Sequence, residues 1–535
     1  MSFKKALRRA FLIVTPIILS IGYLWSVQSP LVASANNEVV YGICFSIFLL
    51  FFLKKVFLKK NDLLVLVSVF SILLISFFIT SGDLSQLIIV LVYFLNFVSV
   101  FLIAKNNSFE NKFYISNVLI RSFLFASVVS VFIVIYQYIG LAEYDLNDPF
   151  GSLWIHASSG YRPSANLAQP NNLGTLFCLG LIATYALVKD RKQRFLWILL
   201  ISFGIFITGS RTAILSTLLL CIFLKRKYKF SDAFLSVFLL IALRSFQLLV
   251  EVQIFPGQQI ETRGVNSGRY LIWIMAIEAL IKEPWWGYGP LGAVHAFFEP
   301  ISRYSKFSEG TVLTSAHNIY LDIFLQFGFF AFVISIIFTF NCFRKFKERS
   351  NAWFFFVKLS CLPIFIHALL EMPLYYSFFA LPFACLLGVS ISSAFSKNYA
   401  IRIFPFYIIL MVFSFVVIND FYKAELYFKK MRLQINNVEI PNPFKGDESC
   451  ILENYCNYVK ATLLARKNER TFEEDSIILD AAKNFPTPLL YVEKIKIMHR
   501  RGMDASKEVN YICNIYKGKV CNEKRVFIDL YKKYN

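Results

Sequence analysis

The sequence is dominated by apolar runs of about 15–20 residues, each separated from the next by a short polar or basic stretch. Such a run is long enough to cross the hydrocarbon core of a bilayer as an α-helix. Only helices and closed barrels satisfy their backbone hydrogen bonds in lipid, and these runs lack the alternation of a barrel strand. Apolar residues make up 57% of the chain, which excludes an ordinary soluble domain. We therefore predict an all-α polytopic membrane protein with about 12–13 transmembrane helices.

Lysine and arginine gather between the apolar runs, and these clusters account for most of the net charge of +21. When the N-terminus is placed inside, all of the clusters fall on the inner side, as the positive-inside rule requires. They lie at residues 54–60, 105–112, 189–194, 225–229, 344–349 and 397–402. The first run, residues 11–27, also resembles a signal peptide, but only an uncleaved span keeps the clusters in phase. The charge thus reflects membrane insertion, and we expect no nucleic acid partner.

This topology divides the chain into membrane helices, two outer loops and an outer tail. The predicted parts are N-terminal transmembrane helices (1–140), a first outer loop (141–172), transmembrane helices (173–250), a large outer loop (251–317), C-terminal transmembrane helices (318–419) and a helical tail (420–535). The cysteines of the tail are Cys450, Cys456, Cys513 and Cys521. Four cysteines outside the membrane allow two disulfides in an oxidising compartment, and the sequence leaves their pairing open.

The large outer loop contains a short apolar helix, predicted over residues 270–282, with Asn266 or Ser267 as its N-cap and Pro284 after its end. The helix is too short to cross a bilayer. With Trp285 and Trp286 behind it, we interpret it as lying along the membrane surface.

His317 stands at the outer N-terminus of the span that follows this loop. A helix N-terminus disfavours a protonated imidazole, and a neutral one suits a general base or a donor to phosphate. The alternative is an interfacial histidine that caps the helix. Asn318, Asp322 and Gln326 continue as a polar stripe, which we interpret as a contact between helices.

Several arginines lie on the same outer face. Arg211 starts a span after Gly209-Ser210, Arg269 starts the surface helix, and Arg162 lies in the first outer loop. Guanidinium groups bind phosphate with two parallel hydrogen bonds, so a group of them predicts a pyrophosphate clamp. Each one taken alone is equally consistent with an ordinary surface charge or with contact to lipid headgroups.

Two polar pairs stand at the outer ends of other spans. Gln169 and Asn171 lie where the first outer loop enters a helix. Their amides could either cap that helix or orient a sugar or phosphate. His367 and Glu371 are four residues apart and so lie on one helix face. They could form either a structural ion pair or a catalytic pair. The sequence lacks a Walker loop and the HExxH, GxSxG and CxxC motifs, so we expect chemistry without a metal or another cofactor.

These residues resemble the O-antigen ligase/polymerase superfamily, and within it the PglL-type protein O-oligosaccharyltransferases. The resemblance runs from about residue 150 to the end of the chain. It rests on Arg162 with Gln169-Pro170-Asn171-Asn172, on Gly209-Ser210-Arg211-Thr212, on the loop from Ser267-Gly268-Arg269 to His317-Asn318, and on the segment from His367 through Glu371 to Leu374. The first and last pieces, together with the outer tail, favour the protein-glycosylating branch.

The resemblance implies an enzyme of the bacterial inner membrane with its site in the periplasm. Its donor would be an oligosaccharide on polyprenyl (undecaprenyl) pyrophosphate, and its acceptor a Ser or Thr of a periplasmic protein such as pilin. Arg211 and Arg269 would hold the pyrophosphate, and His317 would take the hydroxyl proton. The residues implied in substrate binding are Arg162, Gln169, Asn171, His367, Glu371 and Tyr376.

Other functions remain open from the sequence. An O-antigen polymerase or a lipid A-core ligase would use the same chemistry on a different acceptor. A transporter or flippase for lipid-linked sugars would more often show internal repeats and polar residues near the bilayer midplane, which this sequence lacks. A membrane-anchored binding module would place its function in the tail and would tolerate changes at Arg211 and His317.

Overall fold

The structure is a computed structural model of the chain. It describes residues 3–26, 32–53, 55–58, 60–80, 82–139, 141–142, 162–225, 227–254, 268–301, 304, 313–344, 351–391, 399–435, 450–467, 469–485 and 487–515. By its internal packing the chain divides into two compact units. Unit 1 comprises Met1–Leu63, Tyr93–Thr262 and Phe338–Met411, and unit 2 comprises Leu64–Val92, Arg263–Ile337 and Val412–Asn535.

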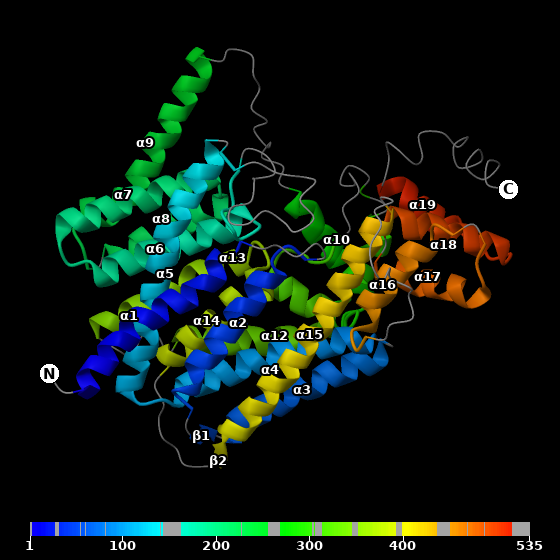
Figure 1. The fold of residues 1–535 in the computed structure, drawn as a ribbon, viewed down its shortest axis with the longest axis horizontal. Coiled ribbons are helices and arrows are strands. Elements are labelled where there is room, and N and C mark those ends of the chain that lie inside the picture. The colour runs from blue at the N-terminus through cyan, green and yellow to red at the C-terminus, as the bar shows by residue number, and fades with distance from the viewer. Residues whose placement is uncertain are drawn as a thin grey trace. The chain divides into compact units, whose positions relative to one another are not determined.

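The elements of unit 1 are almost all helices (Figure 1). They are α1 (Phe3–Leu24), α2 (Ala35–Leu50), β1 (Lys55–Leu58), α5 (Phe109–Tyr138), α6 (Pro170–Leu187), α7 (Arg191–Thr208), α8 (Arg211–Leu224), α9 (Phe230–Ile254), α13 (Ala352–Ala368), η3 (Pro373–Tyr375), α14 (Ser377–Ser390) and β2 (Tyr399–Arg402). Four longer helices contribute residues to both units: α3 (Lys60–Ile79), α4 (Leu84–Asn106), α12 (Ile319–Arg344) and α15 (Ile403–Ile435).

Every apolar run that was predicted to span the membrane forms a helix, which confirms the fold class. Among the described residues, five helices are long and apolar enough to cross a bilayer: α3, α4, α5, α12 and α15. Shorter apolar helices of 10–17 residues accompany them, including α2, α8, α13 and α14. The protein is therefore a polytopic membrane protein.

Helix α6 is the centre of unit 1. It packs against α5, α7, α8 and α13, and every residue from Asn172 to Tyr185 is buried. A helix that is apolar on all sides can be covered by lipid or by other helices, and here other helices cover it. Its N-terminal residues, Pro170 to Asn172, are therefore held in place by the packing of the whole unit.

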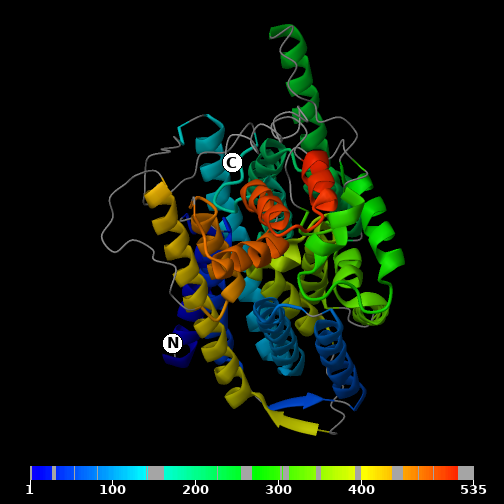
Figure 2. The same ribbon diagram turned by 90° about the vertical axis from the view of Figure 1, so that its right-hand side faces the viewer.

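Two of the basic clusters meet in a small sheet that the sequence did not predict. β1 and β2 pair antiparallel, with Lys55 opposite Arg402 and Leu58 opposite Tyr399. Figure 2 shows this pair of strands at the lower edge of the view. Because paired strands lie side by side, the two basic loops that carry them share one end of unit 1.

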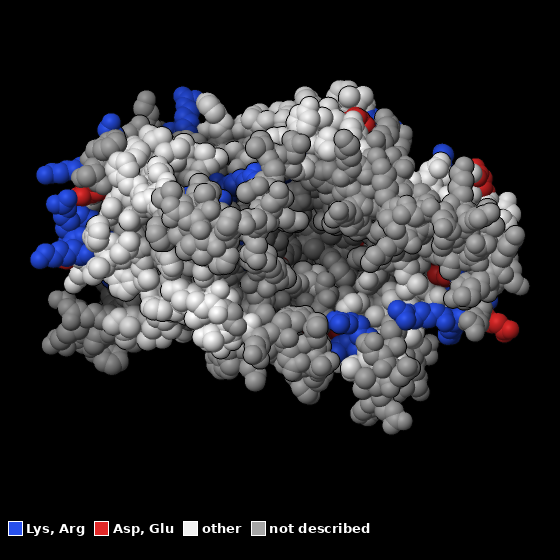
Figure 3. All heavy atoms as spheres, turned by 90° about the horizontal axis from the view of Figure 1, so that it is seen from above, with Lys and Arg blue, Asp and Glu red and all other residues white. Residues whose placement is uncertain are grey.

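Hydrogen bonds join the other basic loops of unit 1 to neighbouring segments. They are Lys105 with Asp62 (2.9 Å), Lys112 with the Ile391 carbonyl (2.8 Å), Arg191 with Asp232 (2.7 Å) and Lys227 with the Ala352 carbonyl (3.1 Å). Figure 3 shows basic side chains gathered at the left edge of the view. The turn between α6 and α7 is itself basic, with Lys189, Arg191 and Lys192. Since α6 begins at Pro170 and ends before this basic turn, residues near its start lie at the opposite end of unit 1.

Unit 2 combines the large loop with the tail. The loop forms α10 (Arg269–Lys282) and α11 (Ala293–Ile301), and the tail forms α16 (Glu453–Leu464), α17 (Phe472–Asn484), α18 (Pro488–Arg500) and α19 (Ser506–Ile515). Figure 2 shows the orange and red tail helices beside the green helices of the loop. The helix predicted over residues 270–282 is confirmed as α10, and its place along the membrane surface stays a prediction. Its predicted N-cap residues, Asn266 and Ser267, lie outside the described residues, and Gly268 precedes the first helical residue.

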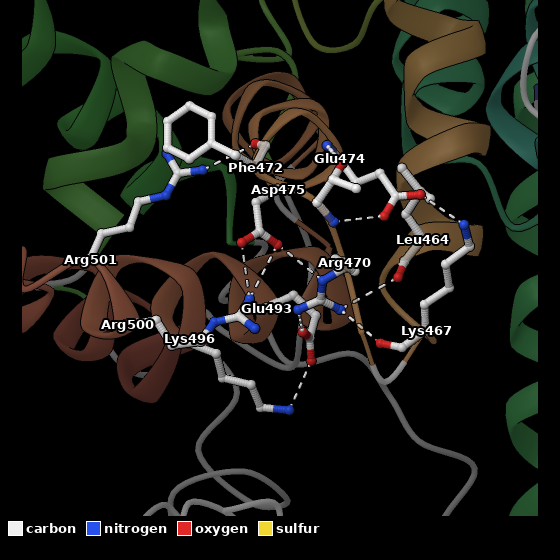
Figure 4. A network of polar contacts seen from close by, with 11 residues as sticks. Leu464, Lys467, Arg470, Phe472, Glu474, Asp475, Glu493, Lys496, Arg500 and Arg501 are labelled. Atoms are coloured by element: carbon white, nitrogen blue, oxygen red, sulfur yellow. Dashed lines mark hydrogen bonds and ion pairs between the residues drawn. The ribbon is translucent and has the colours of Figure 1, made fainter.

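A buried ion-pair network ties the tail helices together (Figure 4). Arg470, whose side chain is 5% exposed, pairs with Asp475 at 3.0 Å and with Glu493 at 2.7 Å. Arg500 adds a second contact to Asp475, and Lys496 adds one to Glu493. Because each buried carboxylate has more than one cationic partner, removing Arg470 leaves both partly uncompensated, a loss that costs about 3–5 kcal/mol in comparable cases.

One disulfide is present in the described part of the tail. It joins Cys450 and Cys456 at the start of α16. The side chain of Cys513 and the whole of Cys521 lie outside the described residues, so the second predicted pairing stays a prediction.

Candidate active site

In unit 1 the site begins at the tight turn between α7 and α8. Gly209 ends α7 in the left-handed conformation (φ 57°), which glycine adopts without a steric penalty. Ser210 then caps α8, with its hydroxyl accepting the Ala213 N–H at 3.3 Å. Arg211 is the first residue of α8 and is exposed. The turn thus presents a guanidinium at a helix N-terminus, where anions are favoured.

Asn171, at the start of α6, joins three other segments of unit 1. Its Oδ1 accepts the Ser210 hydroxyl at 2.8 Å and lies 3.5 Å from Nη2 of Arg162. Its Nδ2 donates to Oε1 of Glu371 at 3.2 Å. Arg162 in turn donates from Nε to the Thr208 carbonyl at 2.9 Å. The structure therefore brings together Arg162, Asn171 and Glu371, which the sequence predicted separately.

His367 and Glu371 have different side-chain partners in unit 1. His367 is buried in α13 and contacts Thr175 of α6, with Nδ1 2.8 Å from the hydroxyl oxygen. Glu371 contacts Asn171 one turn earlier on α6. Both residues thus join α6 to the end of α13. In the part of the chain that the structure describes, no group of three or more His, Cys, Asp or Glu residues is placed to hold a metal ion.

The remaining two predicted residues of unit 1 stand at helix starts. Gln169 occupies the N-cap of α6 and Tyr376 occupies the N-cap of α14, and neither side chain caps its own helix. The Tyr376 ring stacks on Phe378, with ring centroids 5.3 Å apart. Both side chains are half-buried.

Sequence reasoning missed Glu38, which lies next to Tyr376. The Glu38 carbonyl accepts the Ser377 hydroxyl at 2.7 Å, and its carboxylate accepts from Ser34 at 2.9 Å and from the Tyr93 hydroxyl. A carboxylate in an apolar span is expensive, and such residues usually have a specific role. That rule would have identified Glu38 from the sequence.

In unit 2 His317 adopts an uncommon backbone conformation. Its φ is 54°, in the left-handed region that costs a non-glycine residue about 1–3 kcal/mol. The imidazole-bearing residue is half-buried and directly precedes the cap of α12, where Asn318 accepts the N–H groups of Tyr320 and Leu321 at 3.0 and 3.3 Å. A strained residue persists only where its surroundings hold it.

Asp322 helps to fix this backbone conformation through hydrogen bonds to residues a few positions before it in the chain. Its carboxylate accepts the Ser315 hydroxyl at 2.6 Å and the Ala316 N–H at 2.7 Å. Ser315 Oγ accepts the His317 N–H at 2.9 Å. The contact of Asp322 that we predicted to lie between helices is thus made with the segment that leads into α12. From α10, Trp273 donates to the Ala316 carbonyl at 3.1 Å.

A second feature of α12 is a break at Gly328, whose φ of 74° interrupts the helix. The break exposes carbonyls that the Trp-rich part of the large loop uses. Tyr288 N–H donates to the Leu325 carbonyl at 2.7 Å, and Gly289 N–H donates to the Gln326 carbonyl at 3.0 Å. A Cβ on Gly328 would lie 1.9 Å from the Trp285 carbonyl oxygen, so only glycine fits here.

The loop and the tail share one hydrophobic core in unit 2. Buried residues of α10 and α11 pack in the same cluster as Ala461, Ile478, Ala482 and Leu490 of the tail. Ala316, the neighbour of His317, belongs to this cluster. The tail therefore forms part of the support beneath the His317 segment.

His295, on α11, faces the tail within the same unit. Burial lowers the pKa of its imidazole, and the positive charges of Lys483 and Lys494 lower it further. A hydrogen bond with Asn484 opposes this shift. His295 is thus held neutral between the loop and the tail.

Arg269 is the first residue of α10 and is half-buried. Arg269 and His317 belong to unit 2, whereas Arg211 and the other predicted site residues belong to unit 1. Unit 1 therefore carries one of the two arginines predicted to bind pyrophosphate, and unit 2 carries the other together with the histidine.

Comparisons with known proteins bear on the same segments. Residues 196–336 match the O-antigen ligase family, and this stretch contains Arg211, Arg269 and His317. Residues 357–505 match the C-terminal region of the virulence factor membrane-bound polymerases, and this stretch contains His367, Glu371 and tail helices α16 to α18.

Two relatives from Acinetobacter baylyi are similar to this chain. The general O-oligosaccharyltransferase is 28% identical over 418 residues, which are 72% of this chain and 70% of the relative. The ComP-specific O-oligosaccharyltransferase is 28% identical over 249 residues, 43% of this chain and 44% of the relative. The predicted resemblance is confirmed: this multi-pass membrane protein matches the O-antigen ligase family over residues 196–336 and is distantly similar to an O-oligosaccharyltransferase.

Proposed function

We propose that this protein is an oligosaccharyltransferase that moves a glycan from polyprenyl pyrophosphate to a Ser or Thr hydroxyl of an acceptor protein. One observation carries the proposal: the O-antigen ligase match spans both helix-terminal arginines and the strained histidine. Similarity to a general O-oligosaccharyltransferase over 72% of the chain favours a protein acceptor.

The two arginines stabilise the pyrophosphate leaving group. Arg211 and Arg269 each stand at the first position of a helix, where backbone N–H groups and the helix dipole add to the guanidinium charge. Charge accumulates on the pyrophosphate as its bond to the sugar breaks, and fixed positive groups stabilise that charge in the transition state. Polyprenyl pyrophosphate is a good leaving group, so this arrangement requires no metal ion for the step.

His317 activates the attacking hydroxyl of the acceptor. Its neutral imidazole takes the proton from a Ser or Thr hydroxyl as the oxygen attacks the anomeric carbon. The carbon–oxygen bond to the pyrophosphate breaks at the same carbon, and its electron pair leaves with polyprenyl pyrophosphate. Gln169, Asn171, Glu371 and Tyr376 hold hydroxyl groups of the sugar or the acceptor. Arg162 supports this group through its contact with Asn171, and His367 does so by joining α13 to α6 through Thr175.

The location proposed for the reaction is the periplasmic side of a bacterial inner membrane. The inner loops gather at one end of unit 1, as the positive-inside rule requires of cytoplasmic loops. The start of α6 and the turn before Arg211 lie at the other end. The Cys450–Cys456 disulfide supports an oxidising compartment for the tail.

A glycan acceptor is the second candidate, as in an O-antigen polymerase or a lipid A-core ligase. The family match of residues 357–505 to membrane-bound polymerases favours this alternative. The chemistry at His317 and the arginines is the same for both, so the acceptor alone separates them. A transporter of lipid-linked sugars would need neither a base nor an acceptor.

The test uses the whole purified protein in detergent with undecaprenyl-pyrophosphate oligosaccharide. It receives a panel of periplasmic proteins that includes pilin, and separately a lipid-linked glycan or lipid A-core as acceptor, each with and without EDTA. We expect glycan on a Ser or Thr of a protein, unchanged by EDTA. Glycan that lengthens on lipid, with no protein labelled, would replace the proposal with a polymerase. Donor binding without transfer to any acceptor would favour a transporter.

A further inference from the structure

Asp322 is the buried group that holds the segment leading into α12. It is 1% exposed, and both of its carboxylate oxygens are engaged, one by the Ser315 hydroxyl and one by the Ala316 N–H. Both Ser315 and Ala316 are themselves buried. This contact lies one turn inside the helix that His317 precedes.

Asp322 acts on His317 through the His317 backbone. Ser315 Oγ donates its hydrogen to Asp322 and accepts the His317 N–H at 2.9 Å, so one hydroxyl joins the carboxylate to the histidine backbone. The Ala316 backbone is fixed at both of its polar atoms, at its N–H by Asp322 and at its carbonyl by Trp273. These bonds together over-determine the left-handed conformation at His317.

We propose that Asp322 is the positioning residue for His317. It keeps the residue in the left-handed conformation, and with it the imidazole in the one place from which it can take the acceptor proton. The inference rests on the proposed function, in which His317 is the general base. Asp322 touches neither substrate nor the reacting atoms, so it acts only through Ser315 and Ala316.

The chemistry of the contact explains why a carboxylate is needed. Two donors converge on Asp322, and a carboxylate has an acceptor oxygen for each. The amide of an asparagine has one acceptor oxygen and one donor nitrogen. In either orientation Asp322→Asn leaves Ser315 or Ala316 without its acceptor, while size and shape are unchanged.

The experiment compares Asp322→Asn, Ser315→Ala and Ser315→Thr with wild type in the transfer assay, with His317→Ala alongside. We expect Asp322→Asn to lower kcat by about 10–100-fold with the donor KM within about twofold, because misplacing a catalytic group costs rate and not binding. Ser315→Ala removes the acceptor of the His317 N–H and should lower kcat by about tenfold, whereas Ser315→Thr keeps the hydroxyl and should restore it.

The matched control is Ser360→Ala in α13. It removes another buried serine hydroxyl, which donates to the Phe356 carbonyl of its own helix at 2.9 Å, and should leave kcat unchanged. If Asp322→Asn fails to fold, Ser315→Ala decides the question, because it keeps the carboxylate and its bond to Ala316.

The outcomes separate the inference from the proposed function. If His317→Ala is inactive while Asp322→Asn and Ser315→Ala keep kcat within about threefold of wild type, Asp322 is not a positioning residue. If His317→Ala itself keeps full activity, the proposed role of the base is wrong and the inference falls with it. A rise in donor KM at unchanged kcat in Asp322→Asn would place the residue in binding and would also overturn the inference.

Discussion

The two units hold their functional residues in different ways. In unit 1 the polar side chains hold one another, and the bonds around Asn171 join residues as far apart in sequence as Asn171 and Glu371. In unit 2 the backbone around His317 is held instead, by Ser315 and Asp322, which lie within a few residues of it. The first arrangement is a network of side chains, and the second is a local clamp on the backbone.

The difference fits the two tasks that we propose. A site for an extended, charged donor needs several side chains fixed relative to one another, and a network achieves this because each member limits the others. A general base needs one side chain in one place with its ring nitrogens available for proton transfer. The hydrogen bonds that fix the backbone at His317 meet the requirement for a fixed position.

The largest effect is expected from replacing His317, the residue whose backbone Ser315 and Asp322 hold in place. His317→Ala should lower transfer by about 10²–10⁴-fold while donor binding is retained, because a general base contributes a factor of that size. Binding of the labelled lipid-linked glycan and its rate of transfer are measured on the same preparation. His499→Ala, in the last turn of α18, is the control and should transfer at the wild-type rate. Loss of donor binding in His317→Ala would contradict a purely catalytic role.

Ala316, next to His317, packs in the hydrophobic core that the large loop shares with the tail. Truncating a residue of that core should therefore also disturb the backbone at His317. Ile478→Ala should lower the stability of the protein by about 2–5 kcal/mol, as other buried truncations to alanine do, and should also lower kcat. Val459→Ala is the matched control, since Val459 is equally buried but packs in a separate tail cluster with Met431. Melting temperature and kcat are measured for both. Equal losses of kcat would show that support by the tail is not specific to the shared core.

The network in unit 1 can be tested by exchanging an amide and a carboxylate. Asn171→Asp places a second carboxylate against the buried Glu371 and removes the donor between them, which should cost about 1–3 kcal/mol. Adding Glu371→Gln restores one donor and one acceptor and should recover most of that loss. Thermal melting of the two single variants and the double variant gives the coupling energy. Additive losses would mean that the two side chains do not stabilise each other.

The smallest effect concerns pH and the contact of His295 with the tail. Because the pKa of His295 is lowered in the folded protein, the unfolded chain binds the proton more readily. The stability from this site is therefore complete at neutral pH and is lost as pH falls below the ordinary histidine pKa of 6.5. Melting temperature between pH 7.5 and 5.5 should fall more steeply in wild type than in His295→Gln. Parallel curves would show that the loop–tail contact is insensitive to this proton.

The comparison also explains what the sequence could and could not predict. Helix positions, including α10 and the start of α12 just after His317, follow from local patterns, and the structure confirms them. The role of Asp322 lies within the same local segment, but its side chain could as well have faced another helix. The links from Asn171 to Ser210 and to Glu371 depend on how α6, α8 and α13 pack, which no local pattern specifies. The pairing of β1 with β2 is a contact of the same long-range kind.

The most direct test of the central claim is the anomeric configuration of the glycan–protein linkage. If an acceptor hydroxyl, deprotonated by His317, attacks the anomeric carbon directly, the single displacement inverts the configuration that the sugar has in the donor. NMR of the purified glycopeptide product, compared with the starting lipid-linked glycan, gives both configurations. Our account predicts inversion at a Ser or Thr linkage. Retention would contradict it, because it would require a second displacement through a covalent glycosyl intermediate that His317 as a base does not form.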